Sequence, residues 1–231
     1  ALNALSTATL VSISSTQLAA LLPTQMAALS TSAVAVLTTT QVAGLTTAQA
    51  KVLTLAQVGV LSTTQLQSME VADFAALSAQ AIVGLQTTKV AALSTNQVAA
   101  LTTTQVAAVK ADQVVALTTT QVAKLSTTQL GALTEANVAN LSTAQVNALS
   151  TTQLTSLSNG QIDSLTAAVI TSLATDKLAA LTTSQVTALT ADQMGALSTS
   201  GAAALTTSQV KVLGADQIRA LSTASVAALT T

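Results

Sequence analysis

The chain has 231 residues, of which half are hydrophobic and only 6% are charged, and it contains no Cys, His, Trp or Tyr. Its net charge of −1 and its lack of a basic cluster argue against a nucleic-acid partner, because phosphate neutralisation dominates that affinity. Its hydrophobic content argues against intrinsic disorder. Polar residues also return too often to leave the roughly 18 consecutive apolar residues of a membrane span, so we expect no membrane insertion.

A strict eight-residue repeat runs through the whole sequence. Every eighth residue from Leu5 to Leu229 is apolar, and 26 of these 29 residues are Leu. The exceptions are Ile13, Met69 and Val109. No insertion or deletion interrupts the register, so we predict a single uninterrupted octapeptide-repeat array over residues 1–231, with no linker and no second domain.

Each octad carries a complete signal for starting a helix. With Leu as position one, the consensus is Leu, Ser/Thr, Thr, Thr/Ala/Asp, Gln, Val/Leu, Ala, Ala, as in the segment 101–117. Position two is Ser or Thr in 23 of 29 cases, and position five is Gln in 18 of 28. A hydroxyl followed three residues later by Gln is a capping box, and the Leu and Val on either side form a hydrophobic staple. This pattern predicts one short helix over positions three to eight of each octad.

Minority residues along the chain agree with this prediction. The only Pro, Pro23, falls at position three, the first helical position, where its missing N–H costs little. Glu135 has the same position, and four further carboxylates fall at position four, where the helix dipole favours them. These four are Asp112, Asp176, Asp192 and Asp216.

The sequence therefore predicts an all-α solenoid or superhelix of very short helices, one per octapeptide repeat. One continuous helix is disfavoured, because eight residues drift by about 80° per repeat and leave no fixed apolar face. A β-solenoid stays open as an alternative because of the Thr and Val content, although the octad lacks two-residue alternation.

Two stretches depart from the consensus. In the segment 69–90, Glu70 and Gln86 replace the cap and Phe74 takes position six. Drift within a tolerant repeat and a contact site for a partner are the two interpretations of this segment. In the second stretch, Val169 stands where Gln is expected and Ala174 stands at the cap.

The two ends of the sequence continue the repeat. Residues 1–4 have the pattern of positions five to eight of a preceding octad, and Thr231 is position three of a new one. Solenoids normally end in atypical polar repeats, so we expect the array to be part of a longer array or to polymerise.

Residues that could perform catalysis are sparse. General acid–base chemistry uses His or tuned carboxylates, and Glu70 with Asp73 is the only close pair of carboxylates. We expect these two side chains to be solvated. We predict no enzymatic activity and no catalytic, cofactor-binding or metal-binding residue, and no cofactor.

Two resemblances bear on function. The segment LTTTQV resembles the helix openings of several helical-repeat families, including the DNA-binding repeats of transcription-activator-like effectors, but those repeats are several times longer and carry base-reading residues that are absent here. Over its whole length the chain resembles the Leu/Thr/Gln/Ala-rich octad tracts of large bacterial surface or secreted proteins. This second resemblance implies an extracellular or cell-surface structural or adhesive role.

Three functions follow as hypotheses. The first is a structural protein, a subunit or repeat region of an extracellular bacterial filament, sheath or stalk that self-associates into fibres or sheets, consistent with a mean hydropathy of +0.62. The second is a monomeric spacer of a surface adhesin. The third is an ice-binding protein that uses rows of Thr. The Ser and Thr hydroxyls are also candidate sites for glycan modification.

Overall fold

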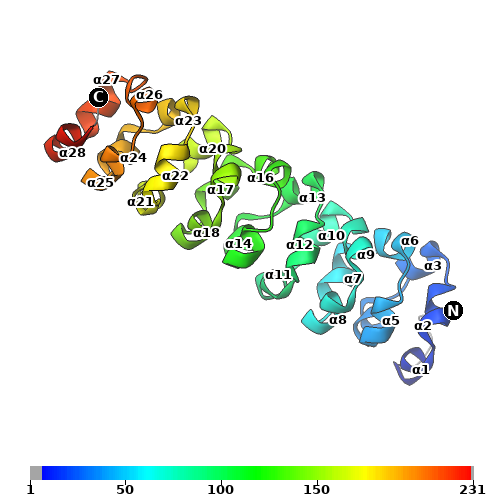
Figure 1. The fold of residues 1–231 in the computed structure, drawn as a ribbon. Coiled ribbons are helices and arrows are strands. Elements are labelled where there is room, and N and C mark those ends of the chain that lie inside the picture. The colour runs from blue at the N-terminus through cyan, green and yellow to red at the C-terminus, as the bar shows by residue number, and fades with distance from the viewer. Residues whose placement is uncertain (1–6, 230–231) are drawn as a thin grey trace. The chain divides into compact units, whose positions relative to one another are not determined.

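In the computed structural model, residues 7–229 are described, and they form short α-helices joined by two- to four-residue connections (Figure 1). Contacts divide the chain into two compact units, Ala1–Leu117 and Thr118–Thr231. The division falls directly after Leu117, position one of its octad, and the Leu register continues across it. The single uninterrupted array stays a prediction, and the predictions for residues 1–4 and Thr231 lie outside the described residues.

The first unit contains fourteen of the described helices. They are α1 (Thr7–Ser12), α2 (Ser15–Ala19), α3 (Pro23–Ala27), α4 (Thr31–Ala35), α5 (Thr39–Ala43), α6 (Thr47–Lys51), α7 (Leu55–Val60), α8 (Thr63–Ser68), α9 (Val71–Ala76), α10 (Ala79–Val83), α11 (Thr87–Ala92), α12 (Thr95–Ala99), α13 (Thr103–Ala108) and α14 (Ala111–Ala116).

The second unit contains the other fourteen. They are α15 (Thr119–Val122), α16 (Thr127–Ala132), α17 (Glu135–Ala139), α18 (Thr143–Ala148), α19 (Thr151–Thr155), α20 (Asn159–Ser164), α21 (Ala167–Ser172), α22 (Thr175–Ala180), α23 (Thr183–Ala188), α24 (Ala191–Gly195), α25 (Thr199–Ala203), α26 (Thr207–Val210), α27 (Ala215–Ala220) and α28 (Thr223–Ala228).

Every described helix begins at position three of its octad and ends between positions six and eight. The prediction of an all-α solenoid with one short helix per octad is therefore confirmed. The β-solenoid alternative is wrong, because residues 7–229 include no strand. Pro23 opens α3 as expected. The helices are this short because each one is stopped by the start signal of the next.

Two extended residues separate one helix from the next where the helix reaches position eight. After α7, Leu61 has φ −61° and ψ 137°, and the N-cap of α8, Ser62, has φ −69° and ψ 164°. The Leu61 N–H still donates to Val58 O at 3.3 Å, which closes the last turn of α7. Among residues 7–229 no residue has a positive φ, so this connection needs no Gly, and almost any residue can occupy it.

Within each unit, a helix packs against the helix three octads further along the chain. In the first unit α5 packs on α8 and α6 packs on α9, and in the second unit α24 packs on α27 and α25 packs on α28. Side-chain bonds to the backbone reach 28–31 residues back, as in the bonds of Gln57 to Met26 and Leu29. One superhelical turn therefore takes between three and four octads, which the sequence alone did not give.

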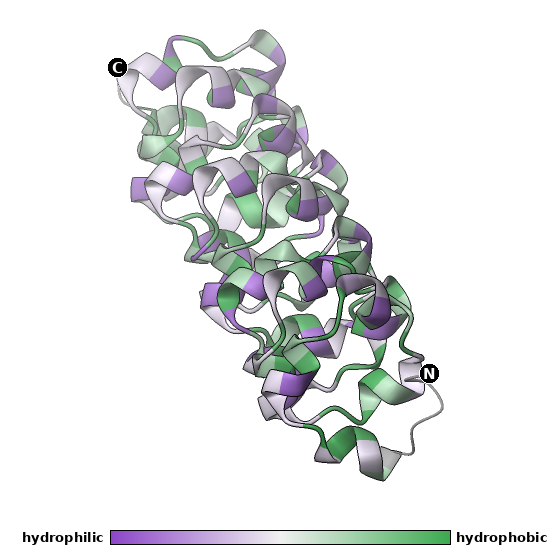
Figure 2. Cartoon of the chain, turned by 90° about the vertical axis from the view of Figure 1, so that its right-hand side faces the viewer, coloured by the Kyte–Doolittle hydropathy of each residue, from purple (hydrophilic) through white to green (hydrophobic). Residues whose placement is uncertain are grey.

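Positions one and six, which carry the Leu and Val of the staple, supply the core. Leu61 at position one is 1% exposed, and Val58 at position six is 0% exposed. Figure 2 shows hydrophobic and hydrophilic residues interspersed along every part of the ribbon, as expected when each short helix contributes few side chains to the interior. Such helices are too short to be stable alone in water, so their stability comes from neighbouring turns.

Burial departs from the simple octad pattern at two residues. Leu101 is only half-buried, unlike Leu61 at the same position. Asp73, expected to be solvated, is buried at 6% exposure, while its neighbour Glu70 is exposed. The reason is that Asp73 occupies position five, which points inward in this solenoid. Phe74, the other unusual residue of this segment, is fully buried at position six.

No helix among the described residues is long and apolar enough to cross a membrane.

Candidate functional site: the glutamine ladder

The feature that recurs most regularly inside the solenoid is the Gln at position five. It occupies the third residue of its helix, and its side chain turns inward, so that Gln41, Gln105 and Gln193 are each only 2% exposed. A Gln side chain carries one oxygen acceptor and one nitrogen with two hydrogens. The structure uses both ends of this amide.

The oxygen end makes the predicted capping box. In α24, the Thr190 N–H donates to Gln193 Oε1 at 2.8 Å, and the Gln193 N–H donates to Thr190 Oγ1 at 3.1 Å. These two bonds satisfy N–H groups that a helix start leaves without partners. The capping function predicted for positions two and five is therefore present where both residues fit the consensus.

The nitrogen end does something that the sequence reasoning missed. Gln193 Nε2 donates to three backbone carbonyl oxygens of the preceding turn, those of Ile162, Asp163 and Leu165, at 3.0, 3.1 and 2.6 Å. One amide thus joins the start of its own helix to the end of a helix four octads earlier and to the following Leu. We call the set of these cross-turn bonds the glutamine ladder.

The ladder is repeated in both units. Bonds from Nε2 to carbonyl oxygens 28–31 residues earlier are made in the first unit by Gln41, Gln49, Gln57, Gln65, Gln97, Gln105 and Gln113, and in the second by Gln153, Gln161, Gln185, Gln209 and Gln217. Buried carbonyl groups require partners, and the ladder provides them for the helix ends.

One signal in the sequence pointed to this role. A capping box accepts Glu as readily as Gln at position five, and the helix dipole favours the carboxylate. Yet no octad of this chain has Glu at position five. A carboxylate has no hydrogen to donate to a carbonyl oxygen, so the choice of Gln over Glu indicates a donor that capping alone does not need.

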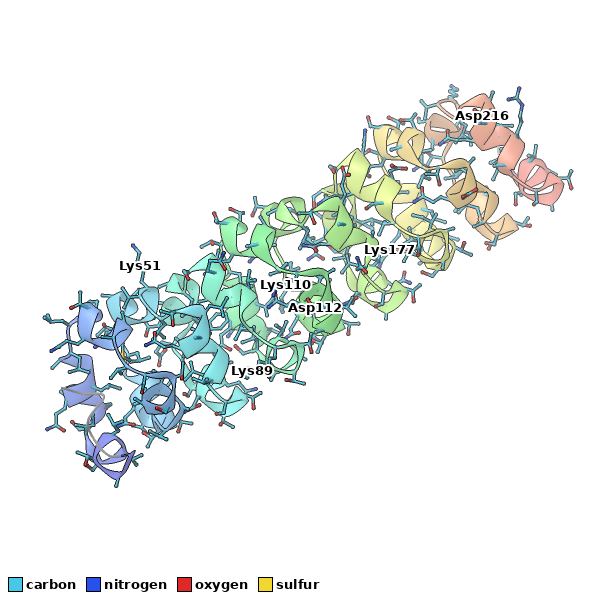
Figure 3. All side chains as sticks on the ribbon, turned by 180° about the vertical axis from the view of Figure 1, so that it is seen from behind. Lys51, Lys89, Lys110, Asp112, Lys177 and Asp216 are labelled. Atoms are coloured by element: carbon cyan, nitrogen blue, oxygen red, sulfur yellow. The ribbon has the colours of Figure 1, made fainter. Side chains whose placement is uncertain are left out.

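Two Lys residues replace the donor where Gln is missing. Lys89 Nζ donates to Gly59 O and Lys177 Nζ donates to Asn147 O, in both cases 30 residues earlier. Neither helix has a side-chain cap, because Gln86 and Ala174 occupy position two. Partial burial lowers the pKa of Lys89. By contrast, Lys51 at position seven extends away from the ribbon and is exposed (Figure 3).

Asp73 breaks the ladder. It accepts a hydrogen bond from the Thr47 hydroxyl at 2.6 Å and donates nothing to the preceding turn. Its sequence neighbour Glu70 caps α9 without a side-chain bond. The structure therefore does not bring the two carboxylates together as a pair. Among residues 7–229, no three His, Cys, Asp or Glu side chains lie close enough to hold a metal ion.

The repeat unit also identifies the family. A model of the ALTTAQ repeat matches residues 2–31, 66–103, 90–119, 106–143 and 203–231, which together cover more than half of the chain. The chain belongs to the ALTTAQ repeat family. In one-letter code ALTTAQ corresponds to position eight followed by positions one to five of the octad, so it ends on the Gln of the ladder. The ALTTAQ octad thus combines the core Leu at position one, the cap at position two and the cross-turn donor at position five. A search of curated proteins found no match to this chain.

Proposed function

We propose that this ALTTAQ repeat chain is a structural protein without enzymatic activity, which self-associates into an extracellular filament, sheath or stalk on a bacterial surface. The observation that carries this proposal is the glutamine ladder. Octads with Gln at position five make the same bonds to the turn before them and offer the same carbonyl groups to the turn after them. A repeat joined in this way adds length with every octad and has no internal feature that limits the number of turns.

In the first and last described turns, side chains at positions that are buried elsewhere in the array are exposed. In the second unit, the position-six side chains from Val122 to Ala202 are buried, whereas Ile218 and Val226 are 43% and 42% exposed. In the first unit, Gln17 and Gln25 are exposed, and their Nε2 atoms have no acceptor among residues 7–229. Apolar side chains and unused donors of this kind are complementary to the surface that a further turn presents.

The charge distribution and the repeat sequence complete the proposal. The chain has only seven Lys and Arg residues, which gives no surface for nucleic-acid phosphates. The bacterial surface location rests on the resemblance to octad tracts of surface and secreted proteins.

Sedimentation velocity over a wide concentration range, together with negative-stain electron microscopy, tests this function. We expect concentration-dependent association into fibres or sheets. The double variant Ile218→Ser/Val226→Ser should weaken the association, because it removes apolar surface from the last turn. The matched control is Val60→Ser. Val60 is 38% exposed and lies in a middle turn of the first unit, so its substitution should leave association unchanged.

The other hypotheses predict different outcomes of the same experiments. A spacer of a surface adhesin would stay a folded monomer at every concentration. An ice-binding protein would show thermal hysteresis as a monomer. Several hydroxyls at positions two and four are already bonded to one another, as in the pairs Ser62–Thr64 and Thr118–Thr120, which leaves fewer of them for ordered water.

A further inference from the structure

The glutamine ladder has one long interruption. Asp73, Ala81 and Lys89 occupy position five in three successive octads, and nowhere else in the sequence do three successive octads lack Gln. Three octads are nearly one superhelical turn. Within the first unit, the turn α6–α8 therefore meets the turn α9–α11 without any position-five Gln between them. We call this boundary the seam.

The joints on either side of the seam are fully laddered. On its N-terminal side, Gln49 and Gln57 each bond to three carbonyl oxygens of the preceding turn, and Gln65 bonds to two. On its C-terminal side, Gln105 bonds to two and Gln113 to three. Gln97, at the edge of the seam, bonds to Leu66 of α8 and to the following Met69.

The seam itself has fewer polar bonds, and they are of another kind. Thr47 donates to Asp73, Lys89 donates to Gly59, and Gln67 of α8 donates to Ala92 O in an exposed position. Ala81 makes no side-chain bond. No Gln amide reaches the carbonyl groups in and after α5–α7 that lie 31 and 28 residues before the three position-five residues, namely those of Val42, Leu45, Ala50, Leu53, Val58 and Leu61.

The helices on the C-terminal side of the seam, α9–α11, are also less well capped than the helices of the laddered turns. Glu70 and Gln86 provide no side-chain cap to α9 and α11, whereas Ser78 still caps α10. Loss of a cap destabilises the first turn of a helix. The apolar contribution is preserved, because Phe74, Ile82 and Val90 remain buried at position six. The missing polar bonds and caps therefore decide the relative strength of this boundary.

We propose that the seam is a built-in yield point, the boundary at which the first unit opens before any laddered joint does. Opening there separates α6–α8 from α9–α11, and of the ladder bonds it breaks only those of Gln97 to Leu66 and Met69. The turns on both sides keep the rest of their ladder. In a load-bearing array, such a boundary extends under tension without unfolding the remaining octads. Stability that varies between adjoining segments in this way is a general property of repeat proteins.

Native-state hydrogen exchange of the full chain, read by mass spectrometry, tests the proposal. The amides to compare are those at position six, which donate to the N-cap carbonyl within each helix. They include Phe74 and Val90 beside the seam and Val98 and Val106 in the laddered turn. We expect exchange in α9 and α11 to be at least tenfold faster than in α12 and α13. Equal rates in the unmodified chain would overturn the proposal.

Two variants test whether the ladder decides where the chain opens. The repair variant, Asp73→Gln, Ala81→Gln and Lys89→Gln with Glu70→Ser and Gln86→Ser, should slow exchange in α9–α11 to the rate of the laddered helices. The reverse variant, Gln97→Ala, Gln105→Ala and Gln113→Ala, should create fast exchange in α12–α14. If the reverse variant left those helices as protected as before, the ladder would not control opening. The unmodified chain decides the question even if either variant fails to fold.

Discussion

The substitution Gln193→Glu is the sharpest test of what the buried amide does. The change is nearly isosteric and keeps the oxygen that accepts the Thr190 N–H. It removes the nitrogen that donates to Ile162, Asp163 and Leu165, and it places an oxygen about 3 Å from those three carbonyl oxygens. Since Gln193 is 2% exposed, the new charge is withdrawn from water.

The magnitude follows from the lost bonds and the buried charge. The two hydrogens of Nε2 correspond to about 1 kcal/mol of net stability each. A buried charge without a partner raises the cost to about 3–5 kcal/mol. A carboxylate near a helix N-terminus recovers only about 0.3–1 kcal/mol, so the loss dominates. We therefore expect Gln193→Glu to lower the unfolding free energy of its region by about 3–5 kcal/mol at pH 7.

The matched control is Gln25→Glu. Gln25 occupies the same position of its octad and accepts the Leu22 N–H at 2.8 Å, but it is exposed and its Nε2 reaches no carbonyl group among the described residues. The same chemical change should there stay within about 0.5 kcal/mol of the unmodified chain. Comparison of the two variants isolates the cross-turn bonds from the capping function.

The pH dependence of the stability of Gln193→Glu provides a second test. Burial raises the pKa of the new carboxyl at position 193 in the folded state, so the folded chain binds its proton more tightly than the unfolded chain. The destabilisation is therefore largest above the folded pKa and shrinks as the pH falls towards about 4, where a Glu is protonated even when unfolded. The protonated group can then donate one O–H to a carbonyl oxygen.

Urea denaturation followed by circular dichroism at pH 7 and pH 4 is the assay, with hydrogen exchange in α20–α24 to localise the effect, because a long array need not unfold in one step. Equal midpoints for Gln193→Glu and Gln25→Glu, or a penalty that is unchanged in acid relative to the unmodified chain, would refute the cross-turn role of the amide.

Three further pairs of substitutions test other parts of the octad. Leu149 is 1% exposed, and Leu149→Ala should lower the unfolding free energy by about 2–5 kcal/mol. Chemical denaturation should show a smaller loss for Leu101→Ala at its half-buried site; the reverse order would contradict the burial pattern. Ser158→Ala removes the cap of Gln161 N–H and should cost about 1 kcal/mol, whereas Ala174→Ser should add a comparable amount; loss of stability in both would contradict the capping model. Gly84→Ala places a Cβ 2.6 Å from Leu55 Cγ and should lower the melting temperature. The Cβ of Gly131→Ala meets nothing within 4 Å, so this substitution should leave the melting temperature unchanged or raise it. Equal shifts would argue against the α7–α10 packing.

The local structure was predictable because its determinants lie within one octad. The hydroxyl at position two, the Gln three residues later and the flanking apolar residues fix where each helix starts, and every described helix starts at position three. The start of the next helix fixes where each one ends. Burial of positions one and six follows from the same periodicity, as Val58 and Leu61 illustrate.

The arrangement of the turns was not predictable from the same pattern. A capping box explains the Gln oxygen at a range of three residues, and the absence of Glu indicates a further donor without locating its acceptors. The acceptors of Gln57, at Met26 and Leu29, lie 31 and 28 residues away. Asp73 was misjudged for a related reason. Its nearness to Glu70 in sequence suggested a solvated pair, but position five is buried in most octads of the described array. The number of octads per turn depends on these long-range contacts.

Exchange of the Gln side-chain amide hydrogens with solvent, followed by nuclear magnetic resonance, tests the ladder most directly. Signals would be assigned through single Gln→Ala variants. We predict two populations: slow exchange for buried ladder residues such as Gln41 and Gln193, and fast exchange for the exposed Gln17, Gln25 and Gln80. Fast exchange of all of them, at the rate of Gln80, would show that the buried amides do not hold the turns together.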